Sequence, residues 1–124
     1  MRSWRFKMDI LEELKELGAD VDEGLGRFMK NEGLYKRMLA KLPSNIEKLE
    51  VLSFIEAGDA QTALSNAHTL KGVTGNLSLT PLYKAYTDIV ALFRADKPEE
   101  AKARLLEVLP IQEKIVACIN AGSC

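Results

Sequence analysis

Hydrophobic residues recur at intervals of three and four along most of the chain, which is the spacing that places them on one face of an α-helix. No stretch alternates between apolar and polar residues as a half-buried strand would. The first helical pattern predicts a helix from Phe6 to Leu17 that ends at Gly18. Its inward residues are expected to be Ile10, Leu11, Leu14 and Leu17.

Two short helices are predicted next, although a single helix broken near Asn31 and Gly33 would give the same pattern. Asp20 and Glu23 have the spacing of a capping box, which predicts a helix start, and Asn31 can cap a second helix over 32–42. The inward residues of the first are expected to be Val21, Leu25, Phe28 and Met29. Those of the second are expected to be Leu34, Tyr35, Met38, Leu39 and Leu42.

Proline and glycine then mark the boundaries of the next helix. Pro43 predicts the end of the preceding one, and Ser44 with Glu47 predicts a capping box that opens a helix to Ala57. Its inward residues are expected to be Ile46, Leu49, Leu52 and Ile55. Gly58 and Asp59 combine a C-cap with an N-cap, so the following helix should lie antiparallel after a very tight turn.

Three boundaries define the C-terminal half. The helix after Asp59 should end near Leu79. The next helix should be capped by Thr80, open with Pro81 and run to Ala95. The last helix should start at a capping box formed by Asp96 and Glu99, and Pro110 should bend it. The inward stripes are expected to contain Ala60, Ala63, Ala67, Leu70, Thr74 and Leu77; then Leu82, Ala85, Tyr86, Ile89 and Phe93; then Ala101, Leu105, Val108, Ile111, Ile115 and Ile119.

Four long amphipathic helices joined by short loops predict an all-α fold. The simplest arrangement is an antiparallel up-down-up-down four-helix bundle, with the additional short N-terminal helices packed over one end. The chain has 124 residues and neither an internal repeat nor a linker, so we expect a single domain over 1–124.

The composition of the chain limits the kinds of partner and the cellular location that can be expected. A formal net charge of −1 provides no bulk field that would attract nucleic acid or an anionic membrane. No apolar run approaches a membrane span and the N-terminus lacks a secretory signal, so we expect a cytoplasmic protein. The initial methionine and compact helical start favour a free-standing protein over a domain cut from a larger sensor kinase. Cys118 and Cys124 are expected to be reduced thiols without a function.

The candidate chemistry centres on His68, the only histidine of the chain. On a helical wheel it lies roughly 130° from the middle of the buried stripe, so its imidazole should face solvent, with Lys71, Gly72 and Gly75 on the same side. Each glycine costs roughly 1 kcal/mol relative to alanine inside a helix. We expect the approach of a partner surface to offset that cost.

A single histidine excludes several kinds of site. Zinc and di-metal sites need more ligands, nothing places a nucleophile and a carboxylate beside His68, and no phosphate-binding loop is present. An exposed histidine titrates at about 6.5 in model compounds, so much of it is neutral at cytosolic pH and has a free lone pair. His68 could therefore accept a phosphoryl group from another protein, with the Lys71 cation stabilising its oxygens and Gly72 giving access.

The sequence A-H-T-L-K-G-V-T-G-N-L at 67–77 resembles the signature of the histidine-containing phosphotransfer (HPt) domains of bacterial two-component phosphorelays. The resemblance extends to G-L-G-R-F at 24–28, L-Y-K-R-M-L at 34–39 and A-G-D-A at 57–60. It implies a four-helix bundle in which His68 is phosphorylated and Lys71 and Gly72 are its companions. Two positions depart from the family pattern. The family often has alanine or serine where this chain has Thr74, and glycine where it has Ser78.

The resemblance also implies the partners. These are response-regulator receiver domains, which carry the donor and acceptor aspartates and supply Mg²⁺, and a hybrid sensor histidine kinase; the chain itself needs no cofactor and is expected to be a monomer. Residues expected to touch a partner are Gln61, Leu64, Ser65 and Gly75. One alternative is a degenerate, non-catalytic bundle that docks a receiver or kinase without carrying phosphate. A second is a small cofactor-binding bundle enzyme.

Overall fold

The computed structural model describes residues 9–122, which contain eight helices and no strand. The expected all-α class is therefore confirmed, whereas residues 6–8 of the first predicted helix and Cys124 lie outside the described part. None of the described helices is long and apolar enough to cross a membrane. The helices are α1 (Ile10–Glu16), α2 (Val21–Arg27), α3 (Glu32–Leu39), α4 (Leu42–Lys48), α5 (Leu52–Glu56), α6 (Ala60–Asn76), α7 (Thr80–Arg94) and α8 (Pro98–Gly122).

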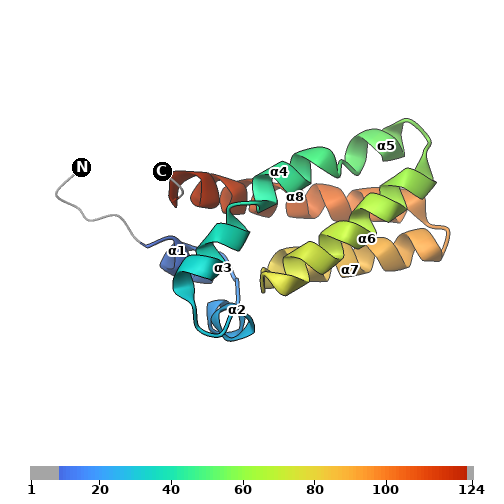
Figure 1. The fold of residues 1–124 in the computed structure, drawn as a ribbon. Helices are drawn as coiled ribbons and strands as arrows, with labels where there is room; N and C mark the ends of the chain where they lie inside the picture. Colours follow the sequence, from blue (N-terminus) through green and yellow to red (C-terminus); the bar gives the residue numbers. More distant parts are fainter. Residues whose placement is uncertain (1–8, 123–124) are drawn as a thin grey trace.

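The last five helices form the predicted antiparallel bundle (Figure 1). Helix α6 packs against α7, and α7 packs against α8. Helices α4 and α5 follow one another along the fourth edge, where they contact both α6 and α8 (Figure 1). The short helices α1, α2 and α3 gather at one end of the bundle (Figure 1).

Three helix starts follow the predicted capping chemistry. The Asp20 carboxylate accepts a hydrogen bond from the backbone N–H of Glu23 at 3.2 Å, and the Asn31 side chain accepts one from Leu34 at 3.0 Å. At the start of α6, the Asp59 carboxylate accepts bonds from the N–H and hydroxyl of Thr62 at 3.1 and 2.7 Å. The three backbone bonds each satisfy an N–H group that has no partner within its helix.

Two further caps were predicted wrongly, because both helices begin earlier than expected, α4 at Leu42 and α7 at Thr80. Pro43 lies in the first turn of α4 instead of ending the preceding helix, so Ser44 is inside α4 and cannot cap it. Pro81 lies in the first turn of α7 as predicted, but the N-cap is Leu79, so Thr80 is the first residue of the helix and not its cap.

The capping box at the start of the last helix is also wrong. Asp96 has a positive φ of 61°, which turns the chain before α8, and its carboxylate caps no N–H in the described part of the chain. The Lys97 carbonyl instead accepts the bond from the Ala101 N–H at 3.0 Å. Pro110 lies inside α8, which continues through it.

The single helix predicted over 44–57 is interrupted between α4 and α5. The Asn66 side chain of α6 donates a hydrogen bond of 2.6 Å to the Glu50 carbonyl, and Val51 is buried at the interruption. A tertiary contact thus satisfies a carbonyl that a continuous helix would have bonded internally. The inward residues of this edge, Ile46, Leu49, Leu52 and Ile55, are partly buried against the core.

Most predicted inward residues are buried or partly buried, and three are exposed. Met29 is 90% exposed because it and Lys30 both have positive φ and carry the chain out of α2, and Ala60 is exposed at the first residue of α6. On α8, Ile111 is 37% exposed and Gln112 is buried in its place. The buried Gln112 carbonyl accepts a hydrogen bond from the Tyr86 hydroxyl, which removes most of the cost of burying both groups.

The N-terminal helices are fastened to the turn between α6 and α7. The Tyr35 hydroxyl donates to the Leu77 carbonyl at 2.7 Å, and the Asp20 N–H donates to the Ser78 carbonyl at 2.9 Å. The Ser78 hydroxyl donates to a Glu23 carboxylate oxygen at 2.8 Å. These three bonds hold α2 and α3 against the turn that follows α6.

Candidate functional site

The helix that carries the histidine has the predicted orientation. Ala63, Ala67, Leu70 and Thr74 form its buried face, and the buried Thr74 hydroxyl donates to the Leu70 carbonyl at 2.8 Å. His68 is exposed on another face, and it makes no hydrogen bond or ion pair with any residue in 9–122. Its imidazole is therefore accessible to a second protein.

Lys71 and Gly72 lie one turn after His68 on α6. Lys71 is partly buried, and its ammonium forms no ion pair within the described part of the chain. A Cβ built at Gly72 would have no neighbouring atom within 4 Å, so the surface beside the histidine is open at this position. The space expected at Gly72 is present.

Gly75 has a different environment from the one predicted. A Cβ built there would lie 2.9 Å from the Cδ1 atom of Tyr83 in α7, which is too close for ordinary packing. The Tyr83 ring therefore fills the space that the sequence suggested was free for a partner. The sequence interpretation missed Tyr83, although its position next to the inward residue Leu82 on the neighbouring helix was a usable signal.

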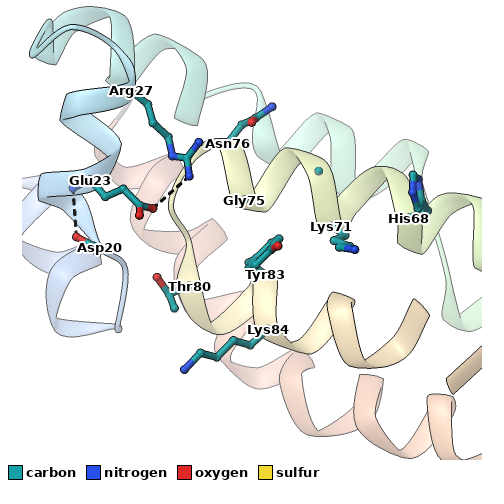
Figure 2. A pocket seen from close by; sticks show the side chains of 11 residues that line it. Asp20, Glu23, Arg27, His68, Lys71, Gly75, Asn76, Thr80, Tyr83 and Lys84 are labelled. Atoms are coloured by element: carbon teal, nitrogen blue, oxygen red, sulfur yellow. Dashed lines mark hydrogen bonds and ion pairs between the residues drawn. The ribbon is translucent and has the colours of Figure 1, made fainter. Parts of the chain in front are cut away.

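An open cleft of about 590 Å³ brings these residues together between α2, α6 and α7 (Figure 2). Four predicted site residues line it, namely His68, Lys71, Gly72 and Gly75. Gln61, Leu64 and Ser65 lie earlier on α6 and do not line it. The other lining residues, which the sequence interpretation missed because they come from distant elements or the helix end, are Asp20, Glu23, Arg27, Asn76, Thr80, Tyr83 and Lys84.

Some of the charged side chains that line the cleft have a hydrogen-bond or ion-pair partner, and others have none within residues 9–122. Asp20 caps the Glu23 N–H, while Glu23 accepts the Ser78 hydroxyl and pairs with Arg27 at 3.5 Å. Lys84 is exposed and, like Lys71, has no ion-pair partner in residues 9–122. Within residues 9–122, the charges that face the cleft without an ion-pair partner are therefore the cations Lys71 and Lys84 and the Asp20 carboxylate, which accepts only the Glu23 N–H.

The described residues contain no group of three or more His, Cys, Asp or Glu side chains arranged to hold a metal ion. Cys118 is buried under α1, with its sulfur 3.8 Å from the Ile10 carbonyl, and burial raises the pKa of its thiol to about 11. The chemistry that the cleft can supply comes from one exposed imidazole and its neighbouring cations.

Comparison with models of protein families matches residues 33–119 to the family described as Hpt domain. The match includes all of α3 but its first residue, all of α4 to α7 and most of α8, and it covers more than half of the chain. Comparisons with curated proteins and with solved structures found no match.

Proposed function

Because the chain belongs to the Hpt domain family, we propose that it relays a phosphoryl group between aspartates of receiver domains through a phosphohistidine at His68. One observation carries the proposal. The only histidine of the chain lies exposed in an open cleft, without an internal partner in the described residues and beside an unpaired cation and an open glycine position.

The chemistry follows from the neutral form of the imidazole. Its unprotonated nitrogen attacks the phosphorus of an aspartyl phosphate on the donor receiver, in line with the bond that breaks. An N–P bond forms, the P–O bond to the aspartate breaks, and the donor leaves as a carboxylate. The other ring nitrogen keeps its proton, and the same steps in reverse pass the group to the aspartate of an acceptor receiver.

The neighbours of His68 support this exchange in different ways. The Lys71 ammonium is placed to neutralise the phosphoryl oxygens, and charge neutralisation with positioning supplies most of the catalysis of phosphoryl transfer. Gly72 leaves room for the rim of the partner's active site. We propose that the receiver supplies Mg²⁺ and that the chain uses no cofactor of its own. It acts as a monomer in the cytoplasm, between a hybrid sensor kinase and a response regulator.

The proposal is tested by transfer of radiolabelled phosphate. Receiver domains from the same genome are phosphorylated with a small acyl phosphate and mixed with the protein and Mg²⁺. We expect acid-labile, alkali-stable label on the wild type and none on His68→Gln, which keeps a polar side chain of similar size. Lys71→Gln should be labelled more slowly, by about ten- to a hundredfold.

A labelled His68→Gln variant would refute the role of His68. A wild type that no receiver labels would refute phosphotransfer altogether, and binding of a receiver without label would identify a docking module instead. Circular dichroism of each variant checks that the substitution leaves the helices intact.

A further inference from the structure

Two cations stand at the end of the cleft that is farthest from His68. Figure 2 shows Arg27 reaching in from α2 and Lys84 extending from α7, with Tyr83 between them and the histidine. Tyr83 is 40% exposed, so its ring forms an accessible apolar surface on the way from the histidine to the two cations. Neither cation has a place in the proposed transfer chemistry.

The two cations remain available to a partner. Lys84 has no ion-pair partner within residues 9–122. Among the described residues, Arg27 is paired with Glu23 alone, at 3.5 Å, and the two side chains are 48% and 51% exposed. Exposed pairs of this kind contribute little free energy. If Arg27 moved to another carboxylate, Glu23 would keep its 2.8 Å hydrogen bond from Ser78.

We propose that Arg27 and Lys84 form a second contact point for the receiver domain that docks over His68, and that they select receivers whose docking surface carries acidic side chains opposite this end of the cleft, away from the phosphoaspartate. The inference rests on the phosphotransfer function proposed above. It adds a determinant of partner choice, located on α2 and α7, to the residues of α6 that carry the chemistry.

The dimensions of the cleft support a single partner that covers both ends. His68 and Asn76 both line it and are eight residues apart on one helix, which corresponds to about 12 Å. A specific protein interface buries roughly 800 Å² on each partner, which is ample for that span. Charge pairs at the rim of an interface mainly set association rate and partner choice, so Arg27 and Lys84 should leave the transfer step itself unchanged.

The test separates docking from chemistry. Single-turnover transfer from a phosphorylated receiver is measured over a range of receiver concentrations for Lys84→Glu and Arg27→Gln. At low salt, we expect the half-saturating concentration to rise about tenfold for Lys84→Glu and about threefold for Arg27→Gln, with the maximum rate within about twofold of wild type. At about 1 M salt the difference should largely disappear, because ions screen exposed charges.

Lys114→Glu is the matched control, since Lys114 is exposed on α8, lies outside the cleft, and changes the net charge equally. The inference would be overturned if the half-saturating receiver concentration of Lys84→Glu equalled that of wild type, or if Lys114→Glu raised it as much as Lys84→Glu does. Either result would leave the proposed phosphotransfer function intact. A loss confined to the maximum rate would also overturn the inference.

The contact point can also be tested by measuring the binding of the same receiver in its unphosphorylated form, which involves no phosphoryl transfer. The measurement compares His68→Gln with the double variant His68→Gln/Lys84→Glu. About tenfold weaker binding of the double variant would support the contact point, and equal binding would overturn it.

Discussion

Replacing Gly72 by alanine should make the protein more stable and less active. Gly72 lies inside α6, and a Cβ there would meet no atom within 4 Å, so the methyl group costs nothing in packing. Alanine is favoured over glycine inside a helix by about 1 kcal/mol. The free energy of unfolding should rise by about that amount, which corresponds to an increase of about 3–5 °C in Tm for a domain of this size.

Gly75→Ala is the matched comparison on the same helix. It gains the same helix propensity, but its methyl group would lie 2.9 Å from Tyr83 Cδ1 and displace the ring. We therefore expect Gly75→Ala to be no more stable than wild type. In a Tyr83→Ala background the obstruction is gone, and the same substitution should recover a stabilisation of about 1 kcal/mol.

Urea and thermal unfolding, followed by far-UV circular dichroism, measure the stabilities, and single-turnover labelling measures transfer. Because the Gly72 methyl group would stand on the exposed surface beside His68, transfer to Gly72→Ala should slow by at least about tenfold. A destabilised Gly72→Ala would show that the surface at Gly72 is not open. A stabilised variant with the wild-type transfer rate would refute the role of Gly72 in access.

Two further predictions concern buried tyrosines. Tyr35→Phe removes the 2.7 Å hydrogen bond to the buried Leu77 carbonyl. The free energy of unfolding, measured by urea titration, should fall by about 1–2 kcal/mol. An unchanged free energy of unfolding would contradict the fastening of α3 to the α6–α7 turn. Burial raises the pKa of Tyr35 and of Tyr86 to about 12, above about 10 for an unfolded chain, so the folded protein binds more protons between these values. The contribution of these two tyrosines to the free energy of unfolding should be complete below pH 10 and should fall as the pH rises toward 12. The fall should be less steep in Tyr86→Phe than in wild type. An equal slope in both proteins would contradict the raised pKa of Tyr86.

Features that depend on neighbours along the chain could be predicted well. Asp20, Asn31 and Asp59 act within three residues of themselves, so their caps are visible in the sequence. The exposed position of His68 follows from the period of α6 alone. The wrong cap at Ser44 arose because proline tolerates the first turn of a helix as readily as it ends one. The wrong cap at Thr80 arose because Pro81 occupies the second position of α7 and not the first.

Features that depend on distant segments could not be predicted in this way. The interruption between α4 and α5 is stabilised by Asn66 of another helix, and Gln112 is buried because Tyr86 of α7 satisfies its side chain. The cleft beside the histidine has the same origin. Its wall comes from α2 and part of its floor from Tyr83, so the sequence interpretation found the residues of α6 and missed those that face them.

The attachment of α2 and α3 to the α6–α7 turn has a consequence for the order in which the protein assembles. The contacts among α6, α7 and α8 join consecutive segments, whereas Tyr35 with Leu77 and Glu23 with Ser78 close loops of 42 and 55 residues. Local contacts form with less loss of chain entropy than distant ones. We therefore expect the helical hairpin that carries His68 to form early in folding and the wall of the cleft to close later. Local unfolding should release the same wall first, so hydrogen exchange in α2 should be faster than in α6 and should slow when a receiver is bound.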